Sequence, residues 1–289
     1  MRVLITGDKG FIGTNLTKRL KNEKAIIISH QENESIDILN KNLFSFVKDV
    51  DTIIHLAAKT SIKNALNAPY DTYYTNILGT LNVLDFARSH NIKNIVNIST
   101  YVYGKPLYLP IDEKHALNPH TPYNKSKIIS ENLCKHYSQD YGLNVITLRP
   151  FYVYGPFSNP STFISSIIKQ IKENKKVVLS QKLTKRDFLF IEDFVNLLIK
   201  ILTNFPSGYS VYNVGYGESH SLEEVIQIVE DITNLSIPII YDSKLRPNDI
   251  TDMIADIKKV SKSFDWIPLI NLRDGLKITL DSYDLCFKQ

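Results

Sequence analysis

The chain has 289 residues, of which 43% are hydrophobic and 22% are charged, values that are ordinary for a globular protein. A chain of this length can bury a sizeable core, either as one large domain or as a large domain with a smaller lobe. Lys and Arg exceed Asp and Glu by only 34 to 30. This small surplus does not predict binding to nucleic acid, although it would not repel an anionic metabolite.

The two cysteines, Cys134 and Cys286, lie far apart, and neither has another Cys or His at a metal-ligand spacing. We expect free, reduced thiols and no metal site. The N-terminus leads into a predicted strand without an apolar signal core, and no apolar run approaches the roughly 20 residues of a membrane span. A cytoplasmic protein without a membrane partner is therefore expected.

Strands and helices alternate through the first 150 residues. The predicted strands are short apolar runs at residues 2–6, 25–29, 51–58, 94–99 and 144–150. Helical spacing of apolar residues or helix-ending signals place helices at residues 11–23, 70–91 and 122–142. This order predicts βαβ units and an α/β fold with a Rossmann-type, doubly wound parallel sheet.

The pattern loosens after Pro150. Loops rich in Tyr, Pro and Ser are separated by predicted helices at residues 162–172 and 221–233. We therefore divide the chain into a first domain, residues 1–150, and a smaller C-terminal region, residues 151–289, which sends segments back to the first domain.

Three glycines follow the first predicted strand within TGDKGFIG, at Gly7, Gly10 and Gly13. In a strand–loop–helix unit the first glycine permits the turn and the second lets the backbone approach a pyrophosphate. The third allows the helix to pack close to the strand, which leaves the anion at a helix N-terminus. The spacing and its context predict a dinucleotide-binding loop.

The end of the second predicted strand indicates which dinucleotide is bound. A protein that binds NAD usually has Asp or Glu at the end of this strand, but here the strand ends Ile28-Ser29-His30-Gln31. Ser or His would not repel a 2′-phosphate, and Lys9 lies in the loop where a cation could reach that phosphate. These residues favour NADP(H). In the alternative, Lys9 is a solvated loop residue and the cofactor is NAD(H).

A possible catalytic group lies on the helix at residues 122–142. Tyr123 and Lys127 are four residues apart and share one helix face, and Ser99 ends the preceding strand. A phenol has a pKa near 10, which a lysine ammonium one turn away lowers, while a serine hydroxyl can hold a substrate oxygen. The three together, behind a nucleotide-binding loop, predict proton transfer to or from a substrate.

These segments resemble one known family over nearly the whole chain. TGDKGFIG, HLAA, NILGTLNVL, the ST…VYG turn, YNKSK, LRPFYVYGP, RDFLFIEDF and RPNDITDMIADI are similar to landmarks of the extended short-chain dehydrogenase/reductases. Within these, the chain resembles the nucleotide-sugar epimerase, dehydratase and reductase group. The resemblance implies that Ser99, Tyr123 and Lys127 are catalytic and that residues 151–289 mainly bind a sugar nucleotide.

The resemblance and the loop together give two further sets of candidate residues. The cofactor set is Gly7, Lys9, Gly10, Phe11, Ile12, Gly13, His30, Asp37, Ile38, Leu56, Ala57, Ala58, Lys59, Asn76, Tyr123 and Lys127. The substrate set is Thr100, Tyr152, Arg186 and Arg246, in which the two arginines match residues that clamp a diphosphate. Alternatively, Asp37 caps a following helix, Asn76 is a buried structural amide and Arg186 only pairs with its neighbours.

At several positions the sequence differs from the family patterns, and these differences reduce the number of reactions that the chain is expected to catalyse. Dehydratases of the group carry Asp-Glu where this chain has Thr100 and Tyr101, so we reject dehydration. Epimerases often have Asn where this chain has Tyr152, and an aromatic residue there is similar to some 4-keto-sugar reductases. Lys9 lies where NADPH-dependent GDP-fucose synthases have a basic residue, but the active-site cysteine of those enzymes is missing.

The lead hypothesis is therefore an NADPH-dependent reductase of a 4-keto(-6-deoxy) sugar nucleotide, acting in surface-polysaccharide biosynthesis. The alternative is an NAD-dependent nucleotide-sugar 4-epimerase, similar to UDP-glucose 4-epimerases. A third hypothesis, a non-catalytic NADP sensor, is disfavoured because the chain keeps both Tyr123 and Lys127. The resemblance also implies a homodimer, in which the helices around residues 72–88 and 123–141 pair across a two-fold axis.

Overall fold

A computed structural model describes residues 1–22, 26–28, 37–40, 47, 49–160, 162–174, 176–179, 184–241 and 250–283. The chain divides into two compact units. Unit 1 comprises Met1–Tyr103, Ala116–Pro150 and Val195–Tyr212, and unit 2 comprises Gly104–His115, Phe151–Phe194 and Asn213–Gln289. The chain therefore passes between the units several times rather than once.

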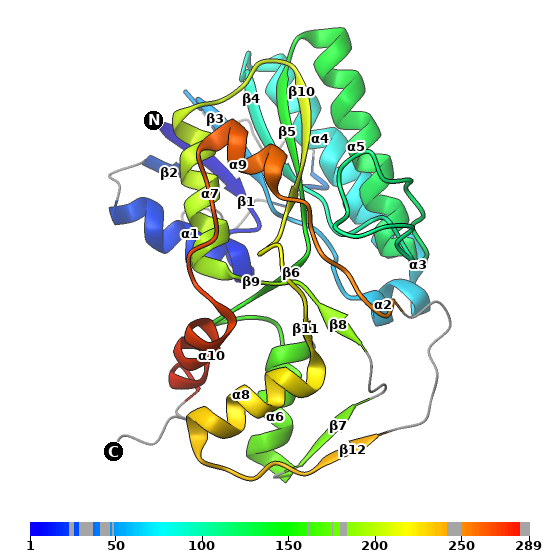
Figure 1. Ribbon diagram of the computed structural model, residues 1–289. Coiled ribbons are helices and arrows are strands. Elements are labelled where there is room, and N and C mark those ends of the chain that lie inside the picture. Colours follow the sequence, from blue (N-terminus) through cyan, green and yellow to red (C-terminus); the bar gives the residue numbers. More distant parts are fainter. Residues whose placement is uncertain are drawn as a thin grey trace. The chain divides into compact units, whose positions relative to one another are not determined.

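Unit 1 is built on a six-stranded sheet in the order β10-β5-β4-β3-β1-β2 (Figure 1). Adjacent strands from β2 to β5 pair in parallel, which confirms the predicted Rossmann-type fold class. The strands are β1 (Arg2–Thr6), β2 (Ile26–Ile28), β3 (Thr52–His55), β4 (Asn94–Ile98), β5 (Asn144–Pro150) and β10 (Tyr209–Val214). The strand predicted at residues 51–58 is shorter than expected, because Leu56–Lys59 continue as an irregular loop.

Helices α4 and α5 lie on one side of this sheet and α1 lies on the other (Figure 1). Val83, Leu84 and Cys134 on these helices pack with Leu4 and Ile53 of the strands into one apolar core. Burial of such side chains contributes about 1.5–3 kcal/mol each. The bounds are α1 (Phe11–Asn22), α2 (Ile62–Asn67), α3 (Pro69–Tyr73), α4 (Gly79–Ser89), α5 (Pro122–Tyr141) and α7 (Ile191–Thr203), the last shared with unit 2.

Helix α5 begins and ends where its sequence predicts. The Thr121 side chain accepts a hydrogen bond from the backbone N–H of Asn124, and Pro122 occupies the first turn, where its missing N–H costs nothing. Gly142 ends the helix with φ +66°, a left-handed conformation that favours glycine. These signals fix the register of the helix that carries Tyr123 and Lys127.

The helix predicted at residues 70–91 differs in one turn. Between α3 and α4 the backbone forms a π-helical turn, η2 (Tyr74–Leu78), which contains the buried Asn76. Such a turn inserts an extra residue into an α-helix and is frequent at functional sites. No helix among the described residues is long and apolar enough to cross a membrane.

Unit 2 combines short strand pairs with helices. β6 pairs with β9 and β7 with β12 in parallel, whereas β8 and β11 are antiparallel. The strands are β6 (Tyr152–Tyr154), β7 (Val177–Leu179), β8 (Lys185–Arg186), β9 (Phe188–Phe190), β11 (His220–Ser221) and β12 (Ile239–Tyr241). The helices are α6 (Phe163–Asn174), α8 (Leu222–Thr233), α9 (Lys258–Phe264) and α10 (Leu272–Asp281).

Candidate active site

A row of polar residues crosses the sheet of unit 1 near the carboxyl ends of its strands. Thr6 is paired with His55, His55 with Asn97, and Asn97 with Thr147, from β1 to β5. Between their first and last residues these strands are mainly apolar and buried, and the row lies at the edge where an open α/β sheet binds its ligands. The predicted cofactor and catalytic residues follow directly after these strand ends.

The glycine loop is held by close backbone packing. Gly7 has φ +75°, and a Cβ there would lie 2.7 Å from the backbone nitrogen of Ala57. A Cβ on Gly13 would lie 2.3 Å from the Gly7 carbonyl oxygen, so only glycine lets α1 approach the loop. A Cβ on Gly10 would meet only the Gly7 oxygen, at 3.2 Å. The loop therefore leaves space beside Gly10 and the N-terminus of α1, which suits a pyrophosphate.

The remaining side chains of the predicted loop are accessible. Lys9 is exposed, and Phe11 and Ile12 are partly buried. Leu56, Ala57 and Ala58 are also partly buried and follow β3, which places them beside Gly7. The predicted cofactor residues on these two loops thus lie together. Their binding of a dinucleotide stays a prediction.

Asn76 joins three segments of the predicted site. Its side-chain oxygen accepts from the backbone N–H of Lys59 at 2.8 Å, and its side-chain nitrogen donates to the Lys59 carbonyl at 3.1 Å. The same nitrogen donates to the Ser126 hydroxyl on α5 at 2.9 Å. Asn76 is 2% exposed, so in this structure it is a buried amide that shapes the loop after β3. The Lys59 ammonium lies 3.5 Å from Asp71.

Asp37 and Ile38 are fixed against α4. The Asp37 carboxylate accepts from the backbone N–H of Leu39 at 3.0 Å, within a turn. The Ile38 carbonyl accepts from the Asn82 side chain at 2.8 Å, and a Cβ on Gly79 would lie 2.3 Å from the Ile38 side chain. Asp37 remains exposed at the edge of the site, where it is free to accept from a ligand hydroxyl.

Helix α5 presents Tyr123 and Lys127 on one face. The Lys127 ammonium donates to the Ile98 carbonyl at the end of β4, at 2.7 Å. Burial lowers the pKa of Lys127 to about 8, and the negative charge of Glu131 partly opposes this shift. Burial raises the pKa of Tyr123, and a hydrogen bond with the Thr100 hydroxyl partly offsets the rise. The phenol is therefore protonated at neutral pH and can act as a proton donor.

Ser99 is bonded to α5. The residue is 2% exposed, and its hydroxyl donates to Glu131 Oε1 at 2.5 Å. Its catalytic role stays a prediction. The hydroxyl beside Tyr123 is that of Thr100, which the sequence had suggested as a substrate contact. Ser99 and Thr100 directly follow β4, and their hydroxyls have different partners, Glu131 and Tyr123.

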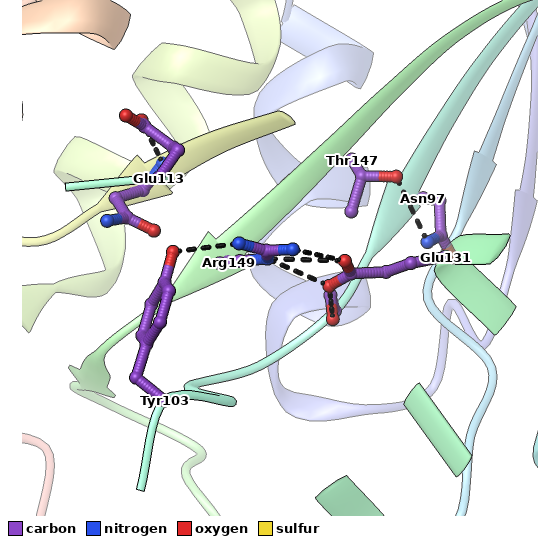
Figure 2. A network of polar contacts seen from close by, with 8 residues as sticks. Asn97, Tyr103, Glu113, Glu131, Thr147 and Arg149 are labelled. Carbon is purple, nitrogen blue, oxygen red and sulfur yellow. Dashed lines mark hydrogen bonds and ion pairs between the residues drawn. The ribbon is translucent and has the colours of Figure 1, made fainter. Parts of the chain in front are cut away.

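Glu131 is part of a buried ion pair with Arg149 of β5 (Figure 2). Arg149 Nη2 donates to Glu131 Oε2 at 2.6 Å, and Arg149 Nε lies 3.0 Å from Oε1. Arg149 Nη1 donates to the Tyr103 hydroxyl at 2.9 Å, and the guanidinium lies 5.3 Å from the centre of the Tyr103 ring. This pair was not predicted from the sequence. The spacing Tyr123, Lys127, Glu131 could have revealed the third residue of one helix face.

His55 lies between two threonines in the polar row. Its ring nitrogens are 2.8 Å from the Thr6 hydroxyl and 3.1 Å from the Thr80 hydroxyl. Burial, and then the charge of Lys127, lowers the pKa of His55 to about 3. His55 is therefore a neutral structural residue and not a general acid.

The predicted substrate residues that the structure describes in unit 2 lie together. The Arg186 guanidinium lies 5.7 Å from the centre of the Tyr152 ring and donates to the carbonyls of Lys185 and Ile250, both at 2.7 Å. Tyr152 also packs edge-on against Phe188. A residue that the sequence analysis did not select, Asp187, accepts three backbone N–H groups, from Tyr216, Gly217 and Ala255. It fixes the loops beside Arg186.

Some predictions fall outside the described residues, among them His30, Arg246 and Cys286. Cys134 is a buried free thiol, as expected, and burial raises its pKa. Among the residues that the structure describes, no cluster of His, Cys, Asp and Glu could hold a metal ion.

Comparisons with known proteins agree on one family. The sequence model for the NAD dependent epimerase/dehydratase family matches residues 3–215. A Methanocaldococcus jannaschii protein, provisionally named a UDP-glucose 4-epimerase, is 32% identical over 95% of this chain and 96% of its own length. The GDP-6-deoxy-D-mannose reductase of Pseudomonas aeruginosa is 27% identical over 98% of this chain and 97% of its own. The structure of RMD from Pseudomonas aeruginosa, complexed with NADPH, superposes with a TM-score of 0.91 over 98% of both chains, at 27% identity.

Proposed function

Because the chain belongs to the NAD-dependent epimerase/dehydratase family, we propose that it is an NADPH-dependent reductase of a 4-keto(-6-deoxy) sugar nucleotide. The family membership confirms the resemblance on which the sequence analysis relied. Its relatives include both a nucleotide-sugar reductase and nucleotide-sugar 4-epimerases, which match the lead hypothesis and its alternative. The observation that carries the choice of a reductase is Lys9, an exposed cation in the glycine loop.

The site fits a dinucleotide. Gly7 and Gly13 close the loop by backbone packing that a Cβ would prevent, and Gly10 leaves the N-terminus of α1 open to a phosphate group. Lys9 would pair with a 2′-phosphate, and Asp37 would accept from a ribose hydroxyl at the edge of the site. The residues that follow β3, with Asn76 behind them, would line the nicotinamide side. When bound, NADPH supplies a hydride for reduction.

The side chains of unit 1 then supply the proton. The Thr100 hydroxyl and the Tyr123 phenol hold the 4-keto oxygen of the sugar, and Tyr123 donates its proton as negative charge develops on that oxygen. Lys127, one turn away, carries a positive charge that favours the resulting phenolate. The raised pKa of Tyr123 supports the reductive direction, because the phenol must be protonated at the start of the reaction.

Residues of unit 2 would bind the rest of the substrate. Arg186 is suited to a diphosphate, because a guanidinium can donate two parallel hydrogen bonds to neighbouring oxygens. Tyr152, over which Arg186 lies, would contact the sugar. Arg246 keeps the diphosphate role that the family resemblance implies.

A 4-epimerase is the second candidate, and the family supports it directly. An epimerase needs the same Tyr123 first as a base and then as an acid, and it returns its NAD to the starting state in each turnover. An epimerase therefore has no need of NADP, and a cation such as Lys9 that binds the 2′-phosphate would bring it no advantage. The structure of RMD from Pseudomonas aeruginosa, which has the same fold, holds NADPH.

The test is cofactor oxidation with a panel of enzymatically generated 4-keto-6-deoxy sugar nucleotides, with NADPH and NADH compared at equal concentration. Loss of absorbance at 340 nm with NADPH supports the reductase. Lys9→Ala should weaken NADPH binding about 10-fold or more and leave NADH binding unchanged, since only NADPH carries the 2′-phosphate. Conversion of a fully hydroxylated sugar nucleotide without added cofactor would instead establish the epimerase.

The same proposal includes a homodimer that serves surface-polysaccharide biosynthesis. Tyr70 and Tyr74 stack on each other with 74% and 45% of their surfaces exposed, and Ile129 of α5 is 40% exposed. Exposed apolar and aromatic residues on neighbouring helices are typical of a helix-packed interface.

A further inference from the structure

The segment that carries Thr100 is fastened to α5 on both sides. Before it, the Ile98 carbonyl accepts from Lys127 at 2.7 Å. After it, the Tyr101 carbonyl accepts from the Asn124 side chain at 2.8 Å. Both contacts fix the backbone, but neither orients the side chain of Thr100 toward the phenol.

The third contact comes from Ser99. Its hydroxyl reaches Glu131, which lies eight residues after Tyr123 and therefore on the same face of α5. This bond fixes Ser99, the residue directly before Thr100, and the Thr100 hydroxyl is hydrogen-bonded to Tyr123. The short distance, 2.5 Å, is typical of a hydroxyl that donates to a carboxylate.

The acceptor of this bond is itself immobilised. Glu131 and Arg149 are 4% and 6% exposed at their side chains and are joined through both carboxylate oxygens. Figure 2 shows the guanidinium between Glu131 and the Tyr103 hydroxyl, so the pair is also bonded to Tyr103, four residues after Ser99 in the same segment. A buried pair with several hydrogen bonds has one geometry, and it transmits that geometry to Ser99.

We infer that Ser99 is a positioning residue that holds Thr100 against Tyr123, and that the Glu131–Arg149 pair is its anchor. The inference rests on the proposed function only in taking Tyr123 as the proton donor. On this account Ser99 does not contact the substrate. The buried ion pair, although remote from the reacting atoms, affects the rate of the reaction through Ser99 and Thr100.

A double-mutant cycle tests this inference in whichever turnover the wild-type protein catalyses. Thr100→Val should lower kcat about 10- to 100-fold, because it removes a hydrogen bond to the reacting oxygen. Ser99→Ala should lower kcat about 10-fold, with KM changed less than about 2-fold. Ser99→Ala should then add nothing in the Thr100→Val background, because it acts only through Thr100.

Additive effects of the two substitutions, or a kcat for Ser99→Ala equal to that of the wild type, would overturn the inference. Thr233→Val is the control for loss of a buried hydroxyl, since the described hydrogen bonds of the Thr233 hydroxyl are local, to the Val229 carbonyl of its own helix and from the Leu235 N–H just after it. It should leave kcat unchanged even if it lowers stability.

Crystal structures of the Ser99→Ala and Glu131→Gln variants give a readout that does not depend on substrate. The inference predicts that the Thr100 hydroxyl leaves the phenol in Ser99→Ala. A Thr100 that keeps its contact with Tyr123 there would contradict it. Absence of turnover in the wild-type protein would refute the proposed function and leave this structural result interpretable.

Discussion

Replacing Arg149 by Met removes the cation from a pair that water cannot reach. Glu131, 4% exposed, would lose the Arg149 Nε and Nη2 donors and keep only the Ser99 hydroxyl. Tyr103 would lose its donor too. Leaving a carboxylate buried without its partner costs about 3–5 kcal/mol. At about 2 °C per kcal/mol for a chain of this size, we expect Tm to fall by about 6–10 °C.

The measurement is thermal and urea unfolding followed by circular dichroism, with the double variant Glu131→Leu/Arg149→Met as the matched control. The double variant carries no buried charge, so it should be more stable than Arg149→Met by about 2–4 kcal/mol. A loss below about 1 kcal/mol in Arg149→Met would refute the reasoning. So would a double variant no more stable than Arg149→Met alone.

Three further predictions concern the loop, unit 2 and the surface. Gly13→Ala should destabilise the protein by about 1–3 kcal/mol, because the new Cβ would lie 2.3 Å from a backbone atom. Gly10→Ala should leave the stability of the protein unchanged and weaken dinucleotide binding about 10-fold. Equal stability of the two variants would contradict this prediction. Burial raises the pKa of Asp187 to about 6, above its value of 3.8 in the unfolded chain, so the stabilisation present below pH 4 is lost as pH rises through 6. Relative to Asp187→Asn, the wild type should lose about 2.4 kcal/mol between pH 4 and pH 7, and a constant difference in urea unfolding across that range would exclude this linkage. Ile129→Lys, at an exposed position of α5, should convert a dimer of twice 33.1 kDa into a monomer in light scattering, whereas a wild-type mass of 33.1 kDa would remove the dimer proposal.

The parallel sheet and the position of the glycine loop could be predicted from the sequence because both depend on local patterns. Short apolar runs, helix caps such as Thr121 and the left-handed Gly142 each act within a few residues. Tyr123 and Lys127 could be paired for the same reason, since helical periodicity alone places them on one face.

The choice between Ser99 and Thr100 could not be made in this way. The two adjacent hydroxyls differ in their partners, and the partner of Ser99 is Glu131, 32 residues away. The partner of Glu131, Arg149, lies on another strand. Long-range contacts of this kind leave no periodic signal in a single sequence. The π-helical turn around Asn76 escaped prediction because it is stabilised by contacts with Lys59 and Ser126 rather than by local propensity.

The sequence predicted that segments after Pro150 return to the first domain, but it did not indicate which segments these are. The boundary of unit 1 falls inside α7 and β10, so Val195–Tyr212 belong with the sheet although they lie between two segments of unit 2 in the sequence. Apolar helices such as α7 have the same pattern in either unit, so composition does not reveal the unit to which they belong.

The central claim is that the protein delivers hydride and a proton to a 4-keto sugar nucleotide. The most direct measurement uses NADPH deuterated on both faces at C4 of the nicotinamide, with Tyr123→Phe as the control. We predict one deuterium at C4 of the product sugar for each NADPH oxidised, and at least about a 100-fold loss of rate in Tyr123→Phe. Conversion of the sugar nucleotide without deuterium incorporation and without net NADPH oxidation would contradict the reductase and favour the epimerase.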